Sequence, residues 1–177
     1  MFEKELTYIK TDFIKEQTKL AIEHFPSYFE RVMSSSTGKY HAVNETLYEH
    51  TCRDVKLAVG IVDLEMFELD QTDKDLIISA LILHDCCKYG REYHQYVLHD
   101  HPMIASKFIK EVCDIDFANV ICPLIEAHSG QWTTSKWSDV VLPKPETKLQ
   151  KIVHLVDYIA SRRYITINLE EPINGRK

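Results

Sequence analysis

Leu76-Ile77-Ile78-Ser79-Ala80-Leu81-Ile82-Leu83-His84-Asp85 is the stretch that decides the fold. It is apolar on almost every side of a helix, so we expect a buried central helix from about Asp73 to Cys87, with its N-cap and acidic first turn at Thr72–Asp75. A carboxylate at the end of such a helix is costly unless it is paired or bound to a cation. His84 and Asp85 are therefore candidate metal ligands. The alternative is one satisfied buried histidine beside a capping aspartate.

Helical periodicity extends over most of the chain. Apolar residues recur at helical spacing in the segments 4–24, 26–33, 45–68, 102–112, 116–128 and 145–163. Asn44 is the expected N-cap of the third of these segments. We found no strong strand pattern and no repeat. The sequence therefore predicts an all-α single domain over residues 1–177, a bundle of about six to seven helices. Its expected parts are N-terminal helices within 4–33, a core at about 45–163 and an irregular tail at 165–177.

Composition and charge narrow the function classes. A chain of 177 residues with 45% hydrophobic residues can bury one sizeable core. A net charge of −6 at pH 7 disfavours a domain whose main task is binding nucleic acid. Five irregularly spaced cysteines favour free thiols in a reducing compartment. The N-terminus does not resemble a signal peptide, and no apolar stretch approaches the roughly 18 residues needed to span a bilayer. We expect a cytoplasmic protein without membrane contact.

Metal-capable side chains also occur on the other expected helices. His50 lies on an apolar stripe, His101 opens a helix before Pro102, His128 ends a helix, and Asp157 lies among apolar neighbours. Imidazole and carboxylate groups suit transition metals that perform hydrolysis. Two ions about 3.5–4 Å apart can share a hydroxide and bind one phosphoryl oxygen together. Four histidines and two aspartates suffice for such a pair, whereas a single ion would leave two or more of them unexplained.

Several of these residues have alternatives that the sequence leaves open. His99 offers a second histidine two positions before His101. His128 could instead be a histidine that the dipole of a helix C-terminus favours. Asp157 could be an ordinary carboxylate on a helix surface.

Asp54, one turn after His50, is interpreted as one half of a surface ion pair, with the orientation of a ligand as the alternative. Trp132 and Trp137 are interpreted as residues that anchor a loop, with stacking on a nucleobase as the alternative.

The order of the histidines and aspartates resembles the HD-domain superfamily of metal-dependent phosphohydrolases. The resemblance covers about residues 45–163 and rests on five segments: His50-Thr51-Cys52-Arg53, Ala80-Leu81-Ile82-Leu83-His84-Asp85-Cys86-Cys87-Lys88, His101-Pro102-Met103-Ile104-Ala105-Ser106, Glu126-Ala127-His128-Ser129-Gly130 and His154-Leu155-Val156-Asp157-Tyr158-Ile159-Ala160-Ser161-Arg162. The two histidines beyond the minimal set of the superfamily point to its dinuclear branch, which includes bacterial diadenosine tetraphosphate hydrolases. The chain departs from the family in having Cys87 where glycine is usual and a short loop at 89–100, which leaves the substrate open.

The resemblance implies an enzyme with two divalent transition-metal ions, Fe or Mn first, with Co, Ni, Zn and Mg as alternatives. It assigns one ion to His50, His84, Asp85 and Asp157, and the other to Asp85, His101 and His128, with Asp85 bridging. A water or hydroxide between the ions is then the nucleophile on phosphorus.

The same resemblance gives roles to basic residues near the metal ligands. Lys88 is placed to hold a phosphate oxygen or to stabilise the charge that develops on it during the reaction. A guanidinium can bind phosphate bidentately, so arginines near the ligands are candidates for the same role. Weaker candidates than Lys88 are Arg91, Arg162 and Arg163.

The resulting hypothesis is a hydrolase that cleaves a phosphoester or phosphoanhydride bond in a nucleotide or another small phosphorylated metabolite. One alternative is a nucleotide-binding regulatory module without turnover. The other is a nuclease, which the net charge disfavours. The complete set of six ligands favours the enzyme, because unused ligands have no physical reason to converge. The expected partner is a small phosphorylated molecule, and a homodimer is left open.

Overall fold

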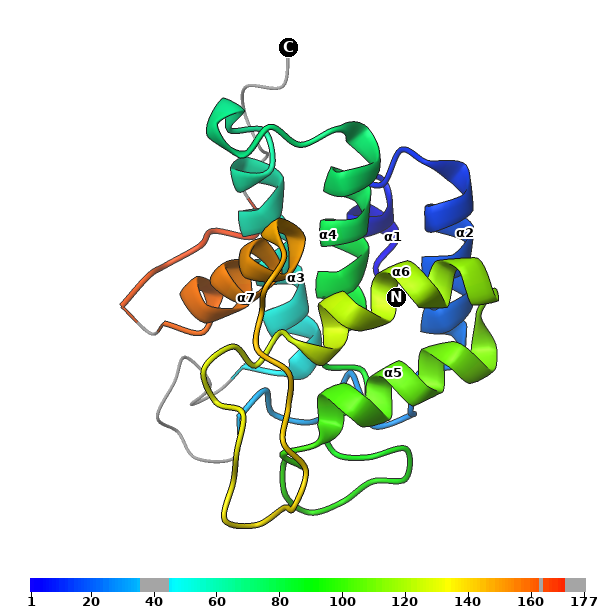
Figure 1. Cartoon of the computed structure of the whole chain (residues 1–177), viewed down its shortest axis with the longest axis vertical. Coiled ribbons are helices and arrows are strands. Elements are labelled where there is room, and N and C mark those ends of the chain that lie inside the picture. Colours follow the sequence, from blue (N-terminus) through cyan, green and yellow to red (C-terminus); the bar gives the residue numbers. More distant parts are fainter. Residues whose placement is uncertain (36–44, 163, 171–177) are drawn as a thin grey trace.

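The computed structural model describes residues 1–35, 45–162 and 164–170, which form seven α-helices and one short 3-10 helix (Figure 1). The elements are α1 (Glu3–Leu6), α2 (Asp12–Glu23), α3 (Leu47–Ile61), η1 (Glu65–Phe67), α4 (Gln71–Leu83), α5 (His101–Val112), α6 (Ile115–Glu126) and α7 (Lys148–Ala160). Extended pairing in these residues is limited to two isolated bridges, Met33 with Thr46 and Ser135 with Ser138. The expected all-α fold is confirmed.

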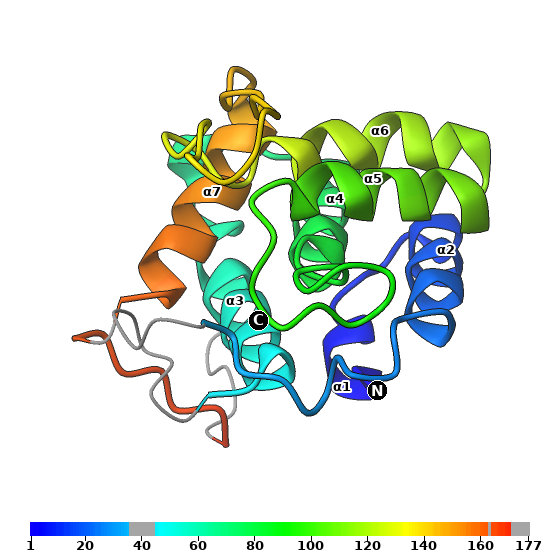
Figure 2. The same ribbon diagram turned by 90° about the horizontal axis from the view of Figure 1, so that it is seen from below.

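The helix α4 is the centre of the bundle, as its sequence predicts. It contacts α2, α3, α6 and α7, and every residue from Asp75 to Leu83 is buried. Figure 2 shows α4 enclosed between α3 and α7 on one side and α2, α5 and α6 on the other. Burial of each large aliphatic side chain stabilises the fold by about 1.5–3 kcal/mol, so this helix fixes how its neighbours pack.

Side-chain caps define where α3 and α7 begin. The Thr46 side chain accepts a hydrogen bond from the Glu49 amide, and the Glu49 carboxylate accepts one in return from the Thr46 amide at 2.8 Å. Thr147 and Gln150 form the same reciprocal pair at α7. Such capping boxes satisfy amides that a helix start leaves without partners. Asn44, the expected cap of α3, lies outside the described residues.

The start and the end of α4 differ from the sequence prediction. Asp70 is the N-cap, and its carboxylate accepts the Asp73 amide at 2.8 Å, so Thr72 lies inside the helix. The helix ends at Leu83, and the chain continues in turns as far as Gly90, which adopts φ +90°. The His-Asp pair therefore lies at the helix end and in the following turn.

Three further helix predictions are corrected. The segment 4–24 is broken because the buried Asp75 carboxylate accepts the amides of Lys10 and Thr11 at 3.0 and 2.6 Å, which holds the chain between α1 and α2 out of helical form. The segment 26–33 forms turns, because the Val32 carbonyl accepts the Leu47 amide at the start of α3. The segment 45–68 is helical only to Ile61 and continues through η1.

The C-terminal end of the described chain returns to the N-terminal helices. The Lys4 side chain donates to the Leu169 carbonyl at 3.3 Å, and no regular element occurs in residues 164–170. Among the described residues, no helix has both the length and the apolar character that crossing a bilayer requires.

Candidate metal centre

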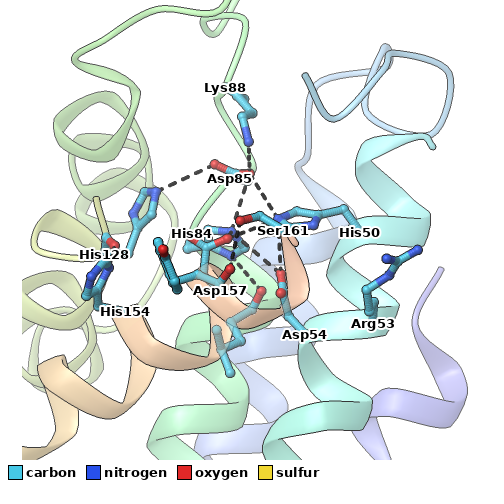
Figure 3. A network of polar contacts seen from close by, with 12 residues as sticks. His50, Arg53, Asp54, His84, Asp85, Lys88, His128, His154, Asp157 and Ser161 are labelled. Atoms are coloured by element: carbon cyan, nitrogen blue, oxygen red, sulfur yellow. Dashed lines mark hydrogen bonds and ion pairs between the residues drawn. The ribbon is translucent and has the colours of Figure 1, made fainter. Parts of the chain in front are cut away.

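The six side chains predicted as ligands lie together beside the end of α4, and Figure 3 shows most of them pointing toward one another. They come from different parts of the chain: His50 from α3, His84 and Asp85 from the end of α4, His101 from the first residue of α5, His128 from the turn after α6, and Asp157 from α7. Five of the six are buried, and the Asp157 side chain is 21% exposed. The fold therefore brings every predicted ligand to one place.

Three of the histidines share one local geometry. Each ring donates from Nδ1 to the carbonyl three residues earlier, at 2.8 Å for His84, 2.6 Å for His101 and 2.7 Å for His128. The acceptors are the carbonyls of Leu81, Leu98 and Ile125. These bonds place the proton of a neutral ring on Nδ1, which leaves a lone pair on Nε2. Each Nε2 faces the cluster, so each ring is oriented as a metal ligand requires.

The first half of the cluster surrounds a single point between α3, α4 and α7. The His50 Nε2 lies 3.1 Å from Asp157 Oδ1 and 4.0 Å from Asp85 Oδ2. The His84 Nε2 lies 3.9 and 3.3 Å from the same two oxygens. Ligand atoms about 2.1 Å from an octahedral ion are about 3.0 Å apart when adjacent and about 4.2 Å apart when opposite. The ligand atoms of His50, His84 and Asp157 lie within 4.8 Å of one another, and Asp85 Oδ2 lies within 4.0 Å of both histidines, which approaches the spacing that one ion needs.

The second half lies on the other side of Asp85. Its Oδ1 is 3.0 Å from the His101 Nε2 and 3.7 Å from the His128 Nε2, and the two Nε2 atoms are 3.2 Å apart. Two neutral rings in this tautomer would point lone pairs at each other across that distance, which is unfavourable without a cation between them.

Asp85 joins the two halves, since Oδ2 faces His50 and His84 while Oδ1 faces His101 and His128. Lys88 also bonds to Oδ2. The buried Nε2 of His84 has no hydrogen-bond partner. A buried polar atom without a partner is costly unless a cation binds it, so the residues present fit a pair of divalent ions.

Asp54 also belongs to the cluster, and its interpretation as a surface ion pair is wrong. The residue is fully buried, and its Oδ2 lies 3.4 Å from the His50 Nε2 and 3.8 Å from the His84 Nε2. Neither of its oxygens has a hydrogen-bond partner. The sequence does contain a signal for this position, because a residue four positions after His50 lies on the same inward face of the helix.

The two halves differ in charge. Burial opposes protonation of His84, but the nearby carboxylates, above all Asp85, outweigh burial and raise the pKa of His84 to about 10. Burial and the neighbouring His84 and His101 instead lower the pKa of His128 to about 3. Without an ion, the His84 ring in the first half is therefore protonated at neutral pH, whereas the His128 ring in the second half is not.

A pocket of about 540 Å³ opens over the cluster. His50, His101, His128 and Asp157 are among the residues that line it, whereas His84 and Asp54 are not. The second half of the cluster therefore borders the pocket with both of its histidines, and the first half lies partly beneath it.

Two aromatic rings form one wall of this pocket. The rings of Trp132 and Tyr158 are stacked, with an 18° angle between their planes and centroids 5.8 Å apart. His99 also lines the pocket, but its Nε2 lies near the Thr133 carbonyl, 3.3 Å away, so His101 rather than His99 lies beside the other candidate ligands.

The predicted phosphate-binding residues separate into two groups. Lys88 and Arg162 both line the pocket, and the Arg162 guanidinium packs 4.1 Å from the centroid of the Tyr158 ring. Arg91 lies elsewhere, because its Nη1 pairs with Glu111 at 2.8 Å and its guanidinium packs over Phe108. Arg163 lies outside the described residues.

His154 and Gly130 hold the turn that carries His128. The His154 Nδ1 bonds to the His128 carbonyl at 2.8 Å, which connects this turn to α7 one turn before Asp157. Gly130 adopts φ +62°, and a Cβ there would lie 2.0 Å from the His154 ring. No pattern in the sequence predicts this contact, because it joins residues 26 positions apart.

The sequence model of the HD domain matches residues 47–162, which include all six predicted ligands. The chain belongs to the HD domain family. This family comprises metal-dependent phosphohydrolases, and the buried His-Asp cluster is the group of side chains that could bind the metal. Searches of curated proteins and of solved structures found no match.

Proposed function

We propose that this HD domain is a two-ion phosphohydrolase that cleaves a phosphoester or phosphoanhydride bond, with a nucleotide as its substrate. The observation that carries the proposal is the position of Asp85, whose two oxygens face two separate pairs of histidines. A carboxylate in that position can hold two ions side by side under the pocket.

Two divalent ions held by these residues would supply a water of lowered pKa and neutralise charge on the phosphoryl oxygens. Among the protein's own groups, Lys88 is the main candidate for contact with phosphate. Burial lowers the pKa of Lys88, but Asp85 and Asp157 outweigh burial and raise it, so the side chain is an ammonium at neutral pH. Because it lines the pocket, the ammonium can bind a phosphate oxygen there.

The aromatic wall supports a nucleotide rather than a small sugar phosphate. Trp132 is 44% exposed while its ring is stacked with Tyr158, so part of its surface is open to a ligand. Stacking of a base on an aromatic ring contributes about 1–3 kcal/mol. The resemblance to diadenosine tetraphosphate hydrolases adds dinucleoside polyphosphates to the substrates to be tested. The five free cysteines support a reducing compartment such as the cytoplasm.

A hydrolysis panel with metal-loaded protein tests the proposal. Protein loaded with Mn²⁺ or Fe²⁺ is incubated with mononucleotides, dinucleoside polyphosphates, sugar phosphates and a short oligonucleotide, and released phosphate or nucleotide is measured. We expect metal-dependent release from a nucleotide. Bound metal without turnover of any compound would indicate a regulatory binding module, and cleavage of the oligonucleotide alone would indicate a nuclease.

A further inference from the structure

We propose that Asp54 is a direct ligand of the ion held by His50 and His84, in addition to the six side chains identified from the sequence. The inference rests on the metal centre of the proposed function, but not on hydrolysis. It gives the first half of the centre three carboxylates, from Asp54, Asp85 and Asp157.

The first argument concerns the hydrogen bonds that a fully buried carboxylate needs. Neither oxygen of Asp54 accepts a hydrogen bond. Asp75, also fully buried, shows the usual arrangement: its carboxylate accepts the backbone amides of Lys10 and Thr11 and the side-chain amide of Gln71, the last at 2.8 Å. Burying an ionised carboxylate without such hydrogen bonds is unfavourable unless a cation lies beside it, and an ion between Asp54 and the Nε2 atoms of His50 and His84 would be that cation.

The second argument is the side of the imidazole ring that Asp54 approaches. A carboxylate that only orients a histidine ligand binds the ring N–H that faces away from the ion. In His84 that position is taken, because Nδ1 donates to the Leu81 carbonyl. The Oδ2 of Asp54 instead approaches the metal-facing Nε2, at 3.8 Å in His84 and 3.4 Å in His50. Figure 3 shows Asp54 pointing into this group.

The third argument is the spacing of the ligand atoms. One atom each from His50, Asp54, His84 and Asp157 forms a group in which all separations are within 4.8 Å. The two distances from Asp54 fall between the adjacent separation of about 3.0 Å and the opposite separation of about 4.2 Å expected around an octahedral ion. Asp54 can therefore coordinate the ion with little movement of the side chain.

The consequence is a strong asymmetry between the two ions. The first ion has two imidazoles and three carboxylates, while the second has two imidazoles and the Oδ1 of Asp85 alone. The charge of the additional carboxylate strengthens binding of a divalent cation, and Asp54 does not line the pocket. The first ion should bind more tightly and exchange more slowly than the second.

Asp54→Asn tests the inference, with Asp75→Asn as the matched control at a second fully buried aspartate. Affinities for Mn²⁺ and Co²⁺ are measured by competition with a chromophoric chelator, and melting temperatures are measured on metal-free protein. In Asp54→Asn we expect affinity for the tighter ion to fall about 100-fold or more. Removing a residue that only hydrogen-bonds to a metal ligand typically costs less than this. The melting temperature of metal-free Asp54→Asn shows whether the variant folds, so that a loss of affinity can be assigned to the metal site. Asp75→Asn should melt at a lower temperature and bind metal normally.

The visible absorption of the Co²⁺-loaded protein separates a ligand from a positioning residue, because it depends on the number and type of coordinating atoms. We expect this spectrum to change in Asp54→Asn and to stay unchanged in Asp75→Asn. Weaker binding with an unchanged spectrum would overturn direct ligation. Wild-type affinity in Asp54→Asn would overturn the inference and leave the proposed function intact, whereas a wild-type protein that binds no metal would overturn the proposed function itself.

Discussion

The two halves of the metal centre use the same types of side chain but differ in charge and in access. The half formed by His50 and His84 has the carboxylates of Asp54, Asp85 and Asp157 beside it, and it lies partly beneath the pocket. The half formed by His101 and His128 has no carboxylate within 4.0 Å apart from Asp85, among the residues that the structure describes, and it borders the pocket with both rings. In the proposed two-ion centre, the first half would therefore hold its ion tightly, and the second half would leave its ion open to the substrate.

The largest expected effect comes from the residue that the two halves share. Asp85→Ala should remove both ions and lower hydrolysis by roughly three orders of magnitude or more, because no other side chain in the described part of the chain faces both pairs of histidines. Metal content by elemental analysis and turnover of the best substrate measure this effect. Retention of one ion at full occupancy would show that Asp85 does not bridge.

His128→Ala should remove the second ion and leave the first ion in place. Removal of this side chain leaves one histidine and one carboxylate oxygen for the second ion, so we expect elemental analysis to find one ion per chain and hydrolysis to fall by roughly 100-fold or more. His99→Ala is the control, since His99 lines the same pocket outside the cluster. Two ions per chain in His128→Ala would contradict the assignment of the second half.

The two ions should also respond differently to pH. His84 has a pKa raised to about 10, so in metal-free protein below that pH its ring is protonated, and the first ion must displace this proton. Affinity for the first ion should therefore rise about tenfold per pH unit, between about pH 7 and pH 9, for each proton displaced. His128 has a pKa of about 3 and holds no proton to displace in this range. Chelator competition at several pH values measures both affinities, and equal slopes would contradict the difference in charge.

The smallest expected effect concerns the pocket rather than the ions. Trp132→Ala should raise the KM for a nucleotide about tenfold and leave kcat and both ions unchanged, since stacking on a base contributes about 1–3 kcal/mol to binding. Trp132→Phe should restore most of the affinity. An unchanged KM in Trp132→Ala would mean that the ring serves only to anchor its loop.

Local patterns were sufficient to predict the central helix and to single out candidate ligands, and the resemblance to the HD-domain superfamily implied that six of them form one group. The apolar sequence of α4 leaves no exposed face, and the candidate ligands lie at helix ends or on inner stripes. The environment of Asp54 was not predictable in this way, because its burial depends on how α4 and α7 pack against α3. The break between α1 and α2 likewise depends on Asp75, which is more than 60 residues away in the sequence.

The position of Arg91 shows the same limit. It follows closely after Lys88 in the sequence, but its guanidinium pairs with Glu111 on α5 rather than facing the cluster. Proximity in the sequence predicts a shared site only where a regular element fixes the direction of both side chains, and here the chain between them runs in turns.

Anomalous diffraction from crystals of the Mn²⁺-loaded protein tests the central claim most directly. We predict two peaks per chain, about 3.5–4 Å apart, one beside each carboxylate oxygen of Asp85. The peak beside Oδ2 should contact His50 and His84, and the peak beside Oδ1 should contact His101 and His128. A single peak, or two peaks that do not share Asp85, would contradict the account.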